Sequence, residues 1–248
     1  MEHLTIERRF RGPPDSANGG YACGSTALPL DGRAATVTLR RPPPLGRPLA
    51  VSFDGGRVQV RDGDELIAEA QPAELDLPCP PPPSYEDAVA AAESFDTETY
   101  TTGHVFPECF TCGPARDPGD GLRLFPGWVP GGGSVVWPWV PSASVCGPTG
   151  EVPSQVVWAA LDCPSGMAWL HSNEVGPAVL GRMTADVVRL PRQAERLVVG
   201  GWRVGAEGRK LVAGSAIWTA DGEVLARNLA TWIRLTDEQR VSFRTTGR

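Results

Sequence analysis

The chain has 248 residues, of which 41% are hydrophobic and 21% are charged, and its formal net charge is −6. This composition excludes global disorder, and the acidic balance argues against a nucleic-acid binder, because phosphate neutralisation needs a basic surface. The N-terminal residues lack the apolar core of a signal peptide, and no run of about 18 apolar residues predicts a membrane span. We therefore expect a cytoplasmic protein of one large or two small domains, with its six cysteines mostly reduced.

The first part of the chain predicts one short helix and several strands. Residues 18–30, "NGGYACGSTALPL", are apolar without strand alternation, which favours a short helix. Residues 33–41 are typical of a strand. In residues 49–75, "DGG" and "DGD" supply turns between alternating valines, which indicates a run of strands.

A sharp change of composition marks residues 78–100. Its proline run cannot join a sheet or a helix interior and favours an extended conformation. Ser84 can then cap a short helix that begins at the next residue. We interpret this stretch as the connection between an N-terminal half, residues 1–77, and a C-terminal half, residues 101–248.

The second half repeats this plan with longer elements. Residues 121–129 and 133–140 are typical of strands, and residues 152–170, "VPSQVVWAALDCPSGMAWL", predict an apolar helix with Pro153 in its first turn. The later turns "AEG" and "ADG" separate three long strands that end near residue 235. Each half therefore places strands around one apolar helix, and the strand-rich part follows the helix.

Three stretches of sequence resemble hotdog-fold acyl-CoA thioesterases, in the arrangement where one chain carries two hotdog halves. They are residues 14–21 ("PDSANGGY"), residues 150–168 around the second helix, and residues 208–235, where a "DG" turn precedes "VLA…ATW". The resemblance implies an α+β double hotdog, with two central helices each wrapped by a curved antiparallel β-sheet. It also implies an acyl-CoA thioester as substrate.

In that family, a carboxylate on the helix is the general base or nucleophile, and this role carries over to Asp162. The family's "HGG" loop before the helix is replaced here by Pro153, Ser154 and Gln155. In the first half the loop survives as Asn18–Gly20, but Ala27 stands where that half's carboxylate would lie. Each half thus keeps one part of the motif and has lost the other.

Helix geometry indicates how the two parts could form one site. Ser154 and Asp162 are eight residues apart, which is about 12 Å of helix rise, whereas reacting groups must lie about 3 Å apart. Two antiparallel helices solve this, because the start of one lies beside the middle of the other. We therefore expect backbone donors from Gly19 and Gly20, with Asn18 nearby, to face the Asp162 carboxylate and hold the oxyanion.

A mirror-related site would combine Ser154 and Gln155 with Ala27. It lacks a carboxylate, so we expect one working site per chain. Ser154 and Gln155 could orient substrate or water there, or they could simply cap the second helix.

Pro164 bears on the role of Asp162. The residue before a proline is pushed away from helical geometry, so we expect the helix to end or kink near Asp162. A helix end would raise the pKa of Asp162 through the negative end of the helix dipole, as would apolar neighbours. The alternative is that Asp162 only hydrogen-bonds the backbone at a helix break.

The stretch "HVFPECFTCGP" contains Cys109 and Cys112 at C-x-x-C spacing, with His104 upstream. Zinc needs four ligands, and a single such pair does not supply them. His104 and Cys146 could complete a set, but the spacing does not require it. We therefore expect a structural turn without metal or cofactor, with a zinc site and redox activity as the alternatives.

Two other functions stay open. A non-catalytic acyl- or ligand-binding protein fits the incomplete motifs in both halves. A hotdog hydratase or dehydratase needs a paired Asp and His on the helix, and the first histidine after Asp162 is His171. The sequence predicts no nucleic-acid or membrane partner, and helix stripes and sheet edges leave pairing into a homo-oligomer open.

Overall fold

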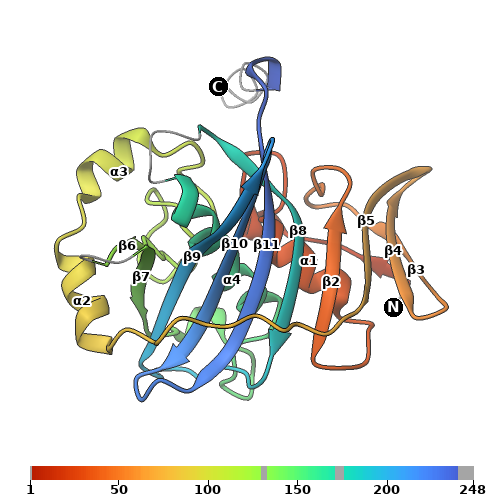
Figure 1. Cartoon of the computed structure of the whole chain (residues 1–248). Coiled ribbons are helices and arrows are strands. Elements are labelled where there is room, and N and C mark those ends of the chain that lie inside the picture. The colour runs from red at the N-terminus through yellow and green to blue at the C-terminus, as the bar shows by residue number, and fades with distance from the viewer. Residues whose placement is uncertain (1, 130–132, 171–175, 240–248) are drawn as a thin grey trace.

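A computed structural model describes residues 2–129, 133–170 and 176–239. Within them the strands form one eleven-stranded antiparallel sheet in the order β1-β3-β4-β5-β2-β8-β11-β10-β9-β7-β6 (Figure 1). The strands are β1 (His3–Leu4), β2 (Ala34–Leu39), β3 (Leu49–Asp54), β4 (Arg57–Asp62), β5 (Glu65–Pro72), β6 (Gly127–Trp128), β7 (Ser134–Trp139), β8 (Ala178–Val187), β9 (Leu197–Glu207), β10 (Lys210–Thr219) and β11 (Val224–Arg234).

The sheet is continuous across the two halves of the chain. Strands from the N-terminal half lie on one side and strands from the C-terminal half on the other, and β2 pairs with β8 at the junction. In this pair Val37 lies opposite Met183, and both side chains are fully buried. The junction therefore belongs to the hydrophobic core, and the two halves share one sheet.

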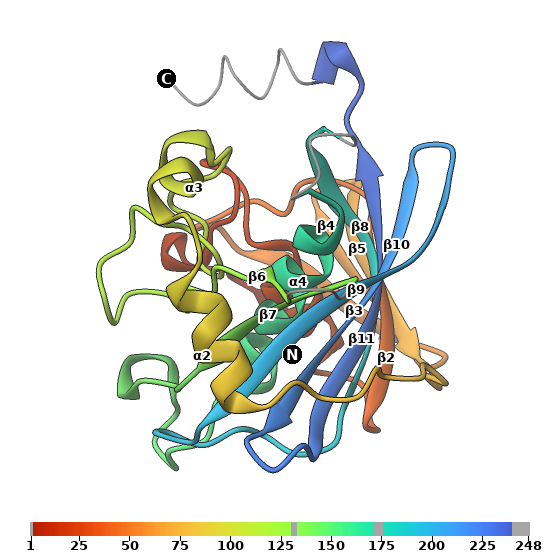
Figure 2. The ribbon, with the colours of Figure 1, turned by 60° about the vertical axis from the view of Figure 1, so that its left-hand side comes forward.

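Two apolar helices lie on the same face of the sheet, α1 (Gly19–Ala27) and α4 (Ser154–Leu170) (Figure 2). They run antiparallel, because Gly20 of α1 lies against Asp162 and Gly24, one turn later, lies against Gln155. A Cβ atom at Gly20 would come within 2.6 Å of the Asp162 Cβ, and one at Gly24 within 2.6 Å of the Gln155 Cα. These two glycines permit the close approach of the helices.

The α4 helix continues through Pro164 to Leu170, so of the two expected outcomes, an end or a kink near Asp162, the end is wrong. Pro164 has no N–H for the carbonyl of residue 160. Side chains from outside or within the helix bind the neighbouring carbonyls instead: Thr111 binds that of Ala159, Ser215 and Asn228 bind that of Leu161, and Ser165 binds that of Asp162. This support keeps the apolar helix intact beyond the proline.

The proline-rich segment crosses the outer face of the sheet, opposite α1 and α4, and joins β5 to α2 (Tyr85–Glu93) (Figure 1). The Leu77 carbonyl accepts a hydrogen bond of 3.0 Å from Arg227 of β11, which fixes the segment to the sheet. Ser84 caps α2 in a capping box with Asp87, as predicted. A second short helix, α3 (Thr97–Gly103), follows.

The expected strand at residues 121–129 is reduced to the two residues of β6. Upstream of β6, the N–H groups of Leu122 and Leu124 donate to the carbonyls of Phe110 and Thr111, so this backbone pairs with a loop and not with the sheet. Two 3₁₀ turns, η1 (Arg8–Phe10) and η2 (Ala143–Val145), complete the regular structure of the described residues. In the part of the chain that is described, no helix has the length and hydropathy needed to cross a membrane.

Candidate active site

Asp162 lies in the middle of α4, where α1 begins, and only 3% of it is exposed. Its Oδ2 accepts two hydrogen bonds from the other half of the chain: 2.9 Å from the Gly20 N–H and 3.1 Å from the Asn18 side-chain amide. Its Oδ1 is buried and has no hydrogen-bond partner among the described residues. The carboxylate is therefore held by hydrogen bonds at one of its two oxygens only.

The environment makes this carboxyl group a much stronger base than an exposed aspartate. Burial raises the pKa of Asp162 to about 7, and negative charge on the nearby Cys109 sulfur acts in the same direction. The hydrogen bonds from Gly20 and Asn18 favour the charged form and oppose this effect. The cause is burial, not the helix end that the sequence suggested, because α4 continues for two further turns.

Asn18 organises the start of α1. Its Oδ1 accepts from the Tyr21 N–H at 2.9 Å, which is an N-cap interaction. Its amide NH₂ group faces both the Asp162 Oδ2 at 3.1 Å and the Cys109 sulfur at 3.7 Å. Asn18 is 2% exposed, so it acts inside the protein and links three segments that are distant in sequence.

The structure thus brings Asn18–Gly20 and Asp162 together, but it changes the expected use of one donor. The Gly20 N–H points at the Asp162 carboxylate, so it is not available for a substrate oxyanion in this arrangement. Gly19 is the first residue of α1, and the Leu180 side chain covers it. The spacing in the sequence was enough to predict that Asn18–Gly20 and Asp162 lie together. It could not predict which acceptor each backbone N–H binds.

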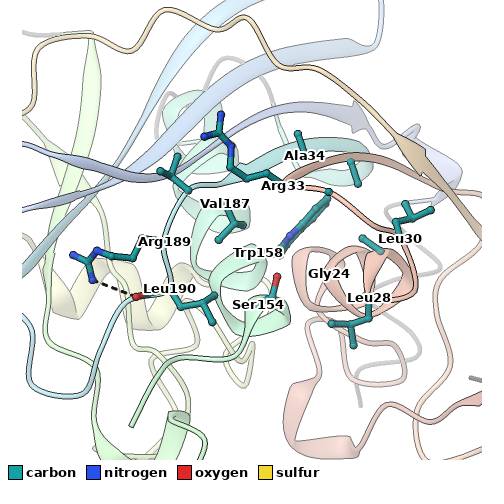
Figure 3. A pocket seen from close by; sticks show the side chains of 14 residues that line it. Gly24, Leu28, Leu30, Arg33, Ala34, Ser154, Trp158, Val187, Arg189 and Leu190 are labelled. Carbon is teal, nitrogen blue, oxygen red and sulfur yellow. Dashed lines mark hydrogen bonds between the residues drawn. The ribbon is translucent and has the colours of Figure 1, made fainter. Parts of the chain in front are cut away.

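The residues of the mirror-related site, Ser154 and Ala27, line a pocket of about 250 Å³ at the opposite end of the two helices (Figure 3). The Trp158 indole lies between the helices in this pocket, and Arg33 and Arg189 also contribute to its wall. Gln155 is half-buried and lies beside Tyr21. The pocket lining contains no carboxylate, which agrees with the motif lost at Ala27.

Sequence reasoning missed the buried polar groups beneath α4. Thr111, Ser215 and Asn228 are fully buried, and all three bind α4 carbonyls beside Asp162. Asn228 also donates to Ser215, and its buried Oδ1 has no hydrogen-bond partner within the described part of the chain. For Ser215 and Asn228 the available signal was a polar residue inside an otherwise apolar strand, since such a group needs a specific partner when buried; Thr111 lies in a turn and gave no such signal.

A cluster of three cysteines lies next to this site. The sulfur atoms of Cys109, Cys112 and Cys163 all lie within 4.8 Å of one another, and all three residues are buried. His104 Nε2 is 3.4 Å from the Cys112 sulfur. Cys146 donates to the Ser142 carbonyl and lies outside the cluster. The sequence suggested Cys146 as a further zinc ligand, and in the structure Cys163 is the cysteine that lies beside Cys109 and Cys112.

The three thiols affect one another. Hydrogen bonds from Cys112 and Cys163 lower the pKa of Cys109 well below its usual range. The same hydrogen bonds raise the pKa values of Cys112 and Cys163. The cluster therefore favours a thiolate at Cys109, which is the sulfur that faces Asn18.

The sequence matches no protein-family model and no curated protein. The structure is similar to that of the tesB protein of Mycobacterium avium subsp. paratuberculosis, with a TM-score of 0.57 and 15% identity over 94% of this chain and 92% of that one. It is also similar to a structure described as a thioesterase II from Thermobifida fusca, with a TM-score of 0.58 and 14% identity over the same shares of the two chains.

The chain therefore has a hotdog-type fold, as its resemblance in sequence implied. At this identity the likeness concerns the fold alone, so the site has to be argued from its own geometry. His171, on which a hydratase would depend, lies outside the described residues.

Proposed function

We propose that this protein is an acyl-CoA thioesterase built as a double hotdog, with Asp162 as its general base. The observation that carries the proposal is the composite geometry: a buried carboxylate on α4 receives hydrogen bonds from Asn18 and Gly20 of the other half. A catalytic carboxylate needs a fixed orientation and a raised pKa, and both are present here.

The arrangement favours a general base over a nucleophile. Two donors hold Oδ2, so Oδ1 is the oxygen free to take a proton. Water loses a proton to Oδ1 as its oxygen attacks the thioester carbonyl carbon. Collapse of the tetrahedral intermediate breaks the carbon–sulfur bond, and the proton passes from Asp162 to the departing thiolate.

The oxyanion needs a donor, and the Gly20 N–H already serves Asp162. The Gly19 N–H is the remaining member of the expected pair, and as the first N–H of α1 it has no partner within its own helix. Because Leu180 covers Gly19, we infer that the acyl group reaches the site by displacing this side chain.

One site per chain follows from the asymmetry of the two halves, residues 1–77 and 101–248. The pocket at Ala27 and Ser154 has an open volume but no carboxylate in its lining. Catalysis is therefore assigned to Asp162 alone.

The test is thiol release from a panel of acyl-CoA thioesters, measured for the wild type and for Asp162→Asn. We expect the variant to lose at least about 100-fold in turnover, within the usual range for removing a positioned base, while thermal denaturation shows that it remains folded. Asp186→Asn is the matched control, because Asp186 is an equally buried aspartate that pairs with Arg33 and Arg227, away from the site. Equal turnover per folded molecule in the wild type and Asp162→Asn would refute the assignment.

The pocket itself favours a second candidate, a protein that binds an acyl or aryl ligand without hydrolysing it. Its wall combines Trp158 with Leu30 and Val187, and it also contains Arg33 and Arg189, which pair with Asp186 and Glu195. Under this alternative, ligand raises the Tm and changes the fluorescence of Trp158, while no thioester in the panel releases thiol.

A further inference from the structure

The loop that carries Cys109 and Cys112 is a tight turn. The backbone N–H groups of Thr111 and Cys112 lie close to the Cys109 sulfur. The Gly113 N–H donates a hydrogen bond of 2.8 Å to the Cys109 carbonyl. A Cβ at Gly113 would lie 2.5 Å from the Cys109 backbone nitrogen and oxygen, so only glycine allows the chain to close this tightly.

The third sulfur comes from a different element. Cys163 is on α4, one residue after Asp162, and its sulfur lies 3.8 Å from that of Cys109. The three cysteines are between 3% and 7% exposed. Three buried thiols within such distances, with no disulfide among them, form a donor set for a soft divalent cation.

We propose that Cys109, Cys112, Cys163 and His104 bind a zinc ion. With zinc–sulfur and zinc–nitrogen bonds of about 2.3 and 2.1 Å, a tetrahedron has sulfur–sulfur edges of about 3.8 Å and sulfur–nitrogen edges of about 3.5 Å. The Cys109–Cys163 distance of 3.8 Å and the His104 Nε2–Cys112 distance of 3.4 Å match these edges. The other sulfur pairs, within 4.8 Å, need to close by about 1 Å or less, and His104 Nε2, which is near Cys112 but outside this group of sulfurs, has to move toward Cys109 and Cys163.

His104 must change tautomer to take part. Its Nδ1 accepts a hydrogen bond of 3.1 Å from the Phe106 N–H, which places the ring proton on Nε2 beside Cys112. Metal binding through Nε2 moves the ring proton to Nδ1, which can then no longer accept the hydrogen bond from the Phe106 N–H. Both residues are half-buried, so water can satisfy the released group.

The ion would be structural, and its effect would extend to the carboxylate. It would clamp the loop of residues 104–112 to α4 next to Asp162. The Cys109 sulfur also faces the Asn18 amide, which in turn binds Asp162. This inference does not depend on thioester hydrolysis, since a binding protein would hold the same ion.

The first test is the metal content of the full chain, purified without chelator from zinc-supplemented cells. We expect about one zinc per chain by plasma mass spectrometry, and a thiolate-to-metal absorption band when cobalt replaces it. Cys112→Ser should lose the metal, while the matched control Cys146→Ser should keep it, because Cys146 is outside the cluster. His104→Ala should weaken zinc binding by at least about tenfold in competition with a chromogenic chelator.

Three results would overturn the proposal. One is wild-type protein with less than about a tenth of an equivalent of zinc and no cobalt band after reduction, judged against the one-ion stoichiometry of a four-ligand site. Another is four instead of six reactive thiols in the denatured protein as isolated, which would mean a disulfide within the cluster. The third is equal metal content in Cys112→Ser and Cys146→Ser. Unchanged zinc affinity in His104→Ala would remove His104 from the ligand set.

Discussion

The contact between α1 and α4 predicts that alanine substitutions at two neighbouring glycines have different effects on the stability of the fold. Replacing Gly20 by alanine puts a methyl group 2.6 Å from the Asp162 Cβ and 3.0 Å from the Ala159 Cα, and also against the Trp158 carbonyl oxygen. These are mostly backbone atoms of a buried helix, so the helices have to separate. Replacing Gly19 puts the methyl group 2.9 Å from the Leu180 Cδ2, which can turn away, and 3.0 Å from the Leu180 Cβ, which needs to shift by only a few tenths of an ångström.

Overpacking of a core costs about 1–3 kcal/mol, and loss of a hydrogen bond to a charged group costs about 1.5–3 kcal/mol. The higher helix propensity of alanine offsets up to about 1 kcal/mol of this loss. We expect Gly20→Ala to lower the free energy of unfolding by about 3 kcal/mol, which is about 6–12 °C in Tm for a domain of this size. Gly19→Ala should stay within about 1 kcal/mol of the wild type.

Urea denaturation of the two variants and the wild type measures this difference. The slope of the unfolding free energy against urea must be equal in all three for the comparison to hold. A Gly20→Ala variant as stable as Gly19→Ala would refute the close helix contact, and with it the placement of the α1 start against Asp162.

Two further predictions concern the same region. Asn18→Ala should lower the free energy of unfolding by about 2–3 kcal/mol, because it removes an N-cap and a donor to the buried carboxylate; a loss under about 0.5 kcal/mol in urea denaturation would contradict this. Gly201→Ala should be destabilising by about 1–3 kcal/mol, because its methyl group meets the Pro164 carbonyl, whereas Gly205→Ala on the same strand has open space and should change stability by less than about 1 kcal/mol. Differential scanning calorimetry compares the last pair, and equal Tm values would count against the packing of β9 on α4.

The sequence was a good guide to local elements and to one long-range relation. The short helix after Asn18, the α4 helix and the long final strands follow from apolar periodicity and turn residues, and the structure confirms them. The separation of Ser154 from Asp162 required a donor from elsewhere, and Asn18 and Gly20 do contact the carboxylate.

What the sequence could not predict depended on partners distant in the chain. Pro164 removes one hydrogen bond of the helix but does not have to end it, and here Thr111, Ser215 and Asn228 bind the adjacent carbonyls of Ala159 and Leu161. Likewise, Cys163 has no metal-like spacing to Cys109, because the fold and not the local sequence brings them together. Cys146, which is nearer to the C-x-x-C pair in sequence, does not belong to the cluster.

The β2–β8 pairing has a consequence for how such a site can evolve. When two identical subunits share an interface, every substitution appears in both copies of each composite site. Here both halves belong to one polypeptide and one sheet, so they mutate independently while their alignment is fixed by strand hydrogen bonds. One helix start could keep its asparagine and glycines while the other became part of a pocket, and the acid could be retained on one helix only. The two ends of the helix pair can therefore take different functions when both halves belong to one chain, which is not possible in a symmetric dimer.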